Sequence, residues 1–217
     1  METSQRNKAH LRTKVLAQRD NLSPALRASY DRRLLSQLQM WLTDIAASQP
    51  SRSDFTVASY VPATNEPGAT LGRDFLGLLG QGLPPEINFH LLLPVCPPGP
   101  PQPLRWGYYT GTLVPGRFGL LEPVPTAEAL PPEQLHHADA ILLPAVAVAE
   151  ASGHRLGRGA GYYDRSLGHA RASAALAAVV HPEEVLPEIP HDHLDRAVDT
   201  IITAQSVSAV TKIEGTR

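Results

Sequence analysis

Short apolar runs alternate with segments of helical character along this chain, and this alternation constrains the fold more than any other feature. Residues 55–61 predict a strand by their β-branched and aromatic content, and further strands are predicted over 89–95, 138–144, 174–180 and 197–203. Continuous apolar runs are typical of parallel strands that are buried on both faces. We therefore expect an α/β fold: a three-layer α/β/α sandwich with a mostly parallel central sheet.

The N-terminal part predicts a pair of helices. Residues 5–20 carry a modest apolar stripe, and Ser23-Pro24 is a typical start for a second helix that ends before Gln49. Further along, we expect short helices over 71–79 and 162–170 and an antiparallel strand over 104–109.

Length and composition limit the class of protein. With 217 residues, 42% hydrophobic and 18% charged, the chain predicts one globular domain over residues 1–217. A net charge of −2 gives no global argument for a nucleic-acid or membrane partner. Because Cys96 is the single cysteine of the sequence, an internal disulfide is excluded. Because the N-terminus is polar, we expect no secretory signal, and no run approaches the ~20 apolar residues of a membrane span. We expect a cytoplasmic monomer.

The most distinctive motif covers residues 155–165, where Gly157, Gly159 and Gly161 alternate with other residues. Alternating glycines let backbone N–H groups approach a ligand closely, and a helix that starts there adds its positive end. Asp164 closes the motif, so we predict a phosphate-binding loop with a metal-binding aspartate. The spacing fits neither a P-loop nor a dinucleotide fingerprint, and a plain strand-to-helix connection is the alternative.

Basic residues concentrate near the N-terminus. Up to Arg33 there are eight Lys or Arg against three acids, although the whole chain is slightly acidic. Lys8, Arg12 and Arg19 fall within about 40° of one another on the predicted helix, beside its apolar stripe. Such a stripe is either a solvated face or part of an anion-binding cleft.

Ligands of parallel sheets collect at the carboxyl ends of the strands. The turn at Glu66, the glycine loop and the segment around His181 all follow predicted strands, so we expect them to converge. Residues 191–195 contain two histidines and two aspartates, but their spacing favours a polar loop near the site over zinc. We expect Cys96 to be a buried small hydrophobe.

Two long segments resemble a known family. Residues 139–144 together with 155–165 are similar to the signature of the 5-formyltetrahydrofolate cyclo-ligases, also called methenyltetrahydrofolate synthetases. Weaker similarities follow in the expected order, at Lys8–Arg12, Tyr60–Gly68, Gly116–Pro123 and Asp195–Thr203. The chain departs from the family pattern at three positions, which are Gly68 in place of a second acid, Ala160 in place of glycine or lysine, and Ala197 in place of proline.

The resemblance implies an ATP- and magnesium-dependent conversion of 5-formyltetrahydrofolate to 5,10-methenyltetrahydrofolate, with release of ADP and phosphate. Arg158 and Tyr162 are the implied catalytic residues, and Arg158 would neutralise charge on the transferred phosphoryl group. The implied ATP-binding residues are Lys8, Arg12, Arg155, Gly157, Arg158, Gly159, Ala160, Gly161 and Tyr163.

The reduced folate would contact Glu66, Phe118 and Tyr162, where the two aromatic rings offer flat faces to the pterin. Asp164 and Asp199 would supply oxygen ligands to Mg²⁺. Two alternatives remain: a paralogue that binds folate or nucleotide but acts on another substrate, and a non-catalytic nucleotide- or RNA-binding module.

Overall fold

The protein is an α/β structure built on one large sheet. The computed structural model describes residues 2–49, 52–124, 129–192 and 195–210. Seven strands lie in the order β12-β11-β9-β6-β1-β2-β3. In chain order they are β1 (Asp54–Ala58), β2 (Asn88–Val95), β3 (Arg105–Tyr108), β6 (Ala140–Pro144), β9 (Ala175–Val179), β11 (Thr200–Ile202) and β12 (Val207–Ala209). The inner strands from β11 to β2 pair in parallel, whereas β3 and β12 are antiparallel at the two edges.

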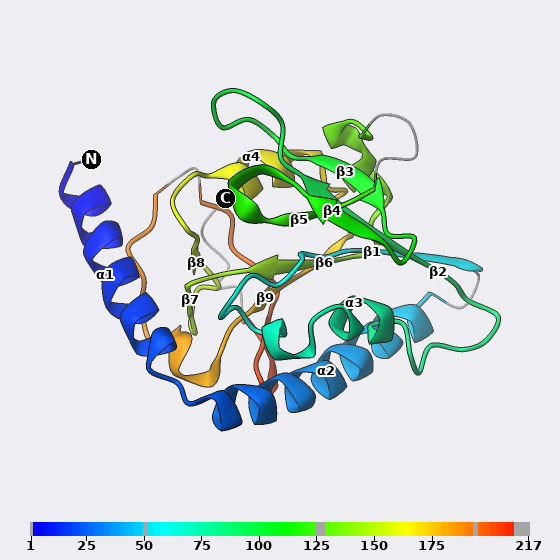
Figure 1. The fold of residues 1–217 in the computed structure, drawn as a ribbon, viewed down its shortest axis with the longest axis horizontal. Coiled ribbons are helices and arrows are strands. Elements are labelled where there is room, and N and C mark those ends of the chain that lie inside the picture. The colour runs from blue at the N-terminus through cyan, green and yellow to red at the C-terminus, as the bar shows by residue number, and fades with distance from the viewer. Residues whose placement is uncertain (1, 50–51, 125–128, 193–194, 211–217) are drawn as a thin grey trace.

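One face of the sheet is covered by α2 (Pro24–Ala47) and the short α3 (Asp74–Leu78), below the sheet in Figure 1. The Ser23 hydroxyl accepts a hydrogen bond from the Leu26 N–H at 3.3 Å, so α2 begins where the sequence predicts. Its buried leucines, Leu34 and Leu38 among them, pack with inward-facing strand residues in a continuous core.

The opposite face is covered by short helices: η3 (Pro132–His137), α4 (Tyr162–Ser166) and η4 (Leu167–His169). Leu135 and Leu167 from these helices pack with Ile141, Leu143 and the fully buried Trp106. Helices therefore cover both faces of a mostly parallel sheet, and the predicted fold class is confirmed. The second helical layer is thinner than a typical sandwich layer, because α4 spans only five residues.

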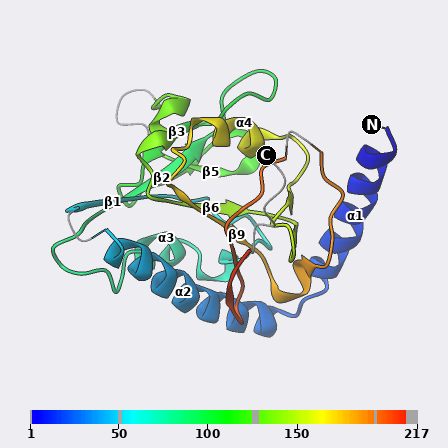
Figure 2. The same ribbon diagram turned by 180° about the vertical axis from the view of Figure 1, so that it is seen from behind.

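Helix α1 (Glu2–Asp20) stands beyond the end of the sheet, beside β7 and β8, and both views agree on this (Figures 1 and 2). It packs on a second sheet of order β10-β7-β8, made of β7 (Ala147–Ala149), β8 (Arg155–Leu156) and β10 (Val185–Leu186). Val15 is the buried centre of this contact. A hairpin of β4 (Leu113–Pro115) and β5 (Leu121–Pro123) lies above the main sheet (Figure 1).

Several predicted boundaries were wrong. The first strand ends at Ala58 rather than at residue 61, and the helix expected over 71–79 is limited to α3 and a preceding 3₁₀ turn, η1 (Ala69–Leu71). The helix expected over 162–170 changes to 3₁₀ geometry at Leu167. Within the described residues, no helix is both long and apolar enough to span a membrane.

Candidate functional site

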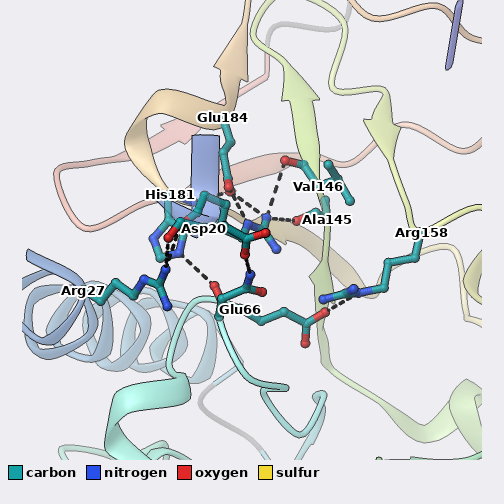
Figure 3. Close-up of polar contacts among 10 residues, drawn as sticks. Asp20, Arg27, Glu66, Ala145, Val146, Arg158, His181 and Glu184 are labelled. Carbon is teal, nitrogen blue, oxygen red and sulfur yellow. Dashed lines mark hydrogen bonds and ion pairs between the residues drawn. The ribbon is translucent and has the colours of Figure 1, made fainter. Parts of the chain in front are cut away.

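Three segments that follow parallel strands meet at the carboxyl edge of the sheet. Glu66 lies in the turn after β1, and its Oε1 accepts a hydrogen bond from Arg158 Nε in the glycine loop at 2.9 Å. His181, just after β9, places Nε2 3.3 Å from the carbonyl oxygen of Asn65. Figure 3 shows Glu66 and Arg158 pointing toward each other across this edge. The predicted convergence of these segments is confirmed.

The Glu66 turn has a fixed geometry. Glu66 Oε2 accepts from the Ala63 N–H at 3.0 Å, and Gly68 N–H donates to Asp31 Oδ1 on α2 at 2.7 Å. Gly68 has φ +94°, and a Cβ there would lie 2.6 Å from the Phe75 ring. A side chain at this position would clash with Phe75, which accounts for the glycine that stands here in place of a second acid.

The turn is held by Asp31, which we did not predict from the sequence. Its buried carboxylate also accepts from the Thr70 N–H at 2.8 Å and from the Thr70 hydroxyl at 2.6 Å. A signal was present, because Asp31 shares a helical face with Leu34 and Leu38. An acid on an apolar face requires a partner.

Arg19 anchors the last turn of α1. It is only 2% exposed and binds Glu184 through two hydrogen bonds, Nε–Oε1 at 2.5 Å and Nη2–Oε2 at 2.8 Å. Nη2 also donates to the carbonyl of Ala145 at 2.7 Å, directly after the end of β6. The neighbouring Asp20 accepts a hydrogen bond from Asn65. Arg19 is therefore a structural anchor rather than a member of an anion-binding stripe.

Lys8 and Arg12 lie on the same helix and face the loops. Lys8 is buried, and its Nζ binds Asp192 at 2.9 Å and Asp195 at 2.6 Å. Burial lowers the pKa of Lys8, but the two carboxylates outweigh burial and leave it raised. Arg12 Nε donates to the carbonyl of Gly157 at 2.8 Å, which joins α1 to the glycine loop.

Asp192 and Asp195, two members of the polar loop expected over residues 191–195, thus lie beside Lys8 of α1. His191 stacks on His154, with ring centroids 3.7 Å apart. The second histidine considered for zinc, His193, lies outside the described residues. Across the described ranges, no group of three or more His, Cys, Asp or Glu side chains could hold a metal ion.

The glycine loop needs glycine at two of its three positions. Gly159 and Gly161 have φ of +105° and +70°, which side chains rarely adopt. A Cβ on Gly159 would also lie 3.3 Å from Arg12 Cζ, whereas nothing lies within 4 Å of a Cβ on Gly157. Ala160 is exposed, and its carbonyl accepts from Arg165 Nη1 at 3.0 Å. The loop is open to solvent, but five-residue α4 adds little helix dipole.

Arg155 and Asp164 form an ion pair at the base of the loop, with Nη2–Oδ1 at 2.8 Å. Burial lowers the pKa of Arg155, against the opposing effect of Asp164. Arg155 Nη1 also donates to the carbonyl of Arg196 at 3.4 Å, three residues before Asp199. The Asp199 carboxylate accepts from the Leu176 N–H at 3.1 Å, next to the start of β9.

Two aromatic side chains lie at the outer side of the loop. Phe118 and Tyr162 have ring centroids 6.5 Å apart, at an interplanar angle of 58°. The pKa of Tyr162 is raised, first by its hydrogen bond with the Cys96 side chain and then by burial. Cys96 is half-buried rather than buried, contrary to our expectation. Burial and then the charge of Glu66 raise the pKa of Tyr163.

Comparisons with known proteins relate most of this chain to one enzyme family. A model of the 5-formyltetrahydrofolate cyclo-ligase family matches residues 4–204. A curated relative from Mycolicibacterium smegmatis, named 5-formyltetrahydrofolate cyclo-ligase, is 42% identical over 204 residues, which is 92% of this chain and 95% of the relative.

Two solved structures share the fold. The 5,10-methenyltetrahydrofolate synthetase of Aquifex aeolicus superposes with a TM-score of 0.68 at 28% identity and covers 97% of this chain and 96% of its own. The synthetase of Mycoplasma pneumoniae gives a TM-score of 0.65 at 22% identity and covers 91% of this chain and 99% of its own; at that identity the likeness concerns the fold alone.

Proposed function

Because this chain belongs to the 5-formyltetrahydrofolate cyclo-ligase family, we propose that it converts 5-formyltetrahydrofolate to 5,10-methenyltetrahydrofolate at the expense of ATP. The observation that carries the proposal is the contact between Arg158 and Glu66. It joins the loop suited to phosphate to the turn suited to the pterin, so both substrates can meet there. The setting we propose is a cytoplasmic monomer without a nucleic-acid partner.

The chemistry has two steps. The formyl oxygen attacks the γ-phosphorus of ATP, and ADP leaves. N10 of the folate then attacks the activated formyl carbon and loses its proton, the carbon–oxygen bond breaks, and phosphate departs with the former formyl oxygen. Such a reaction needs positioning and charge neutralisation more than covalent help from the protein.

The phosphate groups are bound by α1 and the glycine loop. Lys8 and Arg12 supply cations from one side, and Gly157 to Gly161 offer backbone N–H groups from the other. Support comes from the Arg12–Gly157 hydrogen bond, which holds these two elements together. Arg155 and Tyr163 shape the base of the loop, where Arg155 is fixed by Asp164.

Arg158 neutralises the charge that builds on the transferred phosphoryl group. Its side chain is 54% exposed, and among the described residues its hydrogen-bonding partner is Glu66 alone, so it can turn toward phosphate without disturbing the core. Glu66, only 11% exposed, then accepts hydrogen bonds from the pterin. Phe118 and Tyr162 each offer a ring face against which the pterin can pack, and Tyr162 orients the formyl group.

Magnesium is the cofactor that we assign to Asp164 and Asp199. The donor set fits, because Mg²⁺ prefers carboxylate oxygens, keeps several waters and needs few protein ligands. Asp164 is 31% exposed, so its carboxylate can face a solvated ion while Arg155 holds one oxygen. When bound, the ion supplies charge neutralisation for the phosphates.

The test is direct. Protein incubated with 5-formyltetrahydrofolate, ATP and Mg²⁺ should produce methenyltetrahydrofolate, followed by its absorbance, with one ADP released per product. A correctly folded protein that forms no product, or that forms it without ATP, would refute the proposal.

A further inference from the structure

Arg117 stands at the exposed rim of the proposed pterin site. It opens the 3₁₀ turn η2 (Arg117–Gly119), at the tip of the β4–β5 hairpin. Its guanidinium carbon lies 4.9 Å from the centroid of the Phe118 ring, on which it forms a cation–π contact. Phe118 itself is 70% exposed and has φ +58°, so the turn presents this ring outward.

Among the described residues, no carboxylate forms an ion pair with Arg117. Its Nη1 donates to the carbonyls of Pro97 and Gly99, the latter at 3.3 Å. Within the part of the chain that the structure describes, Arg117 forms no ion pair, and Nε and Nη2 make no hydrogen bond. Lys8, Arg155 and Arg158, in contrast, are each paired with an acid.

The nearest hairpin acid is committed elsewhere. Glu122 Oε1 accepts a hydrogen bond from the Cys96 N–H at 2.9 Å, and its carboxyl group lies against Gly116. Arg117 therefore has a side chain positioned by two carbonyls and a ring, with donors to spare. A planar, fork-shaped guanidinium in this state suits a carboxylate ligand.

The proposed substrate brings such a carboxylate. A reduced folate ends in glutamate, which is joined to the pterin through an aminobenzoyl group and carries two negative charges. With the formyl group near Arg158 and the pterin against Phe118 and Tyr162, the tail must leave the site on its open side. Phe118 marks that side because it is largely exposed, and Arg117 is the cation next to it.

We propose that Arg117 binds a carboxylate of the glutamate tail of the folate substrate and so selects folates that carry this tail. The assignment rests on the proposed function. Arg117 holds a part of the substrate that does not react, so the interaction is equally strong in the ground state and the transition state. Losing it should raise KM and leave kcat unchanged.

The experiment compares two substrates on matched variants. One substrate is 5-formyltetrahydrofolate, and the other is its analogue with an uncharged carboxamide in place of glutamate. Arg117→Met keeps an apolar stem against Phe118, Arg117→Lys keeps the charge without the fork, and Arg73→Met removes a charge from the exposed start of α3 as a control.

Arg117→Met should raise KM for 5-formyltetrahydrofolate about tenfold, the lower end for a hydrogen bond to a charged group because the site is exposed. Its kcat and its KM for ATP should stay within about twofold of wild type. The KM of Arg117→Lys for 5-formyltetrahydrofolate should lie between those of wild type and Arg117→Met, and the KM of Arg73→Met should equal that of wild type. For the carboxamide analogue, wild type and Arg117→Met should give the same KM.

Two results would overturn the assignment: an unchanged KM in Arg117→Met, or an equal loss with both substrates, which would mean that Arg117 only supports Phe118. A wild-type protein that turns over neither compound would instead refute the proposed function. In that case, equilibrium titration of 5-formyltetrahydrofolate and its carboxamide analogue onto the same variants still decides whether Arg117 binds the glutamate tail.

Discussion

Breaking the buried ion pair between Arg19 and Glu184 should destabilise the packing of α1 against the rest of the protein. Glu184 accepts two hydrogen bonds from Arg19 and a third from the His181 N–H at 2.8 Å. Both members of the pair are almost fully buried. Glu184→Gln removes the negative charge and nearly preserves the shape.

The magnitude follows from what remains around Arg19. In the variant its guanidinium stays buried with neutral oxygens, among them the carbonyls of Ala145 and Val146. Removing one partner of a buried pair costs about 3–5 kcal/mol, because the other charge is left uncompensated. In a protein of this size, that loss lowers Tm by on the order of 10 °C.

Urea denaturation measures this loss, and the adjacent acid supplies a matched control. Glu183 is exposed and accepts a hydrogen bond from the Tyr30 hydroxyl at 2.5 Å, so Glu183→Gln should cost at most about 1.5 kcal/mol. In Glu184→Gln, the KM for ATP should also rise, because α1 carries Lys8 and Arg12. Equal free energies of unfolding for the two variants would refute the reasoning.

Three further predictions concern the loop, the metal and pH. Gly159→Ala places a side chain at a left-handed position beside Arg12, so it should weaken binding of a non-hydrolysable ATP analogue at least about tenfold, as measured by titration. Gly157→Ala should leave this affinity unchanged, and equal affinities of the two variants would contradict the prediction. Asp164→Asn should abolish turnover with an unchanged circular dichroism spectrum, and near-normal activity would show that the metal site is misplaced. The hydrogen bond to Glu183, with burial, raises the pKa of Tyr30 from 10.0 to about 12. The Tyr30 hydroxyl therefore contributes fully to stability below pH 10, and this contribution is lost between pH 10 and 12. Tyr30→Phe should reduce the slope of the unfolding free energy against pH in that range, and an unchanged slope would disprove the prediction.

Much of the main sheet could be predicted because its evidence is local. The runs that became β6 and β9 are apolar along their whole length, β2 contains the apolar run Leu91–Val95, and Ser23-Pro24 starts α2 by capping alone. The second sheet could not be predicted in this way. Its strands have two or three residues, too few to show a period, and the face that they bury packs on α1, which is far from them in the sequence.

The candidate site, too, could be predicted from the sequence only in part. Convergence of the Glu66 turn and the glycine loop followed from strand order, since carboxyl ends of parallel strands share one edge. The partners of the cations did not follow, because Arg19 meets Glu184, and Lys8 meets Asp192, across more than 160 residues. Sequence spacing along α1 placed both cations on one stripe, but only the fold shows that Arg19 is buried in the core.

The central claim is that the formyl oxygen is phosphorylated and leaves as part of phosphate. It can be measured directly with 5-formyltetrahydrofolate labelled with ¹⁸O in the formyl group, ATP and Mg²⁺, followed by mass analysis of the products. The mechanism predicts one ¹⁸O atom in each inorganic phosphate released and none in water or ADP. Label recovered in water, with unlabelled phosphate, would contradict it.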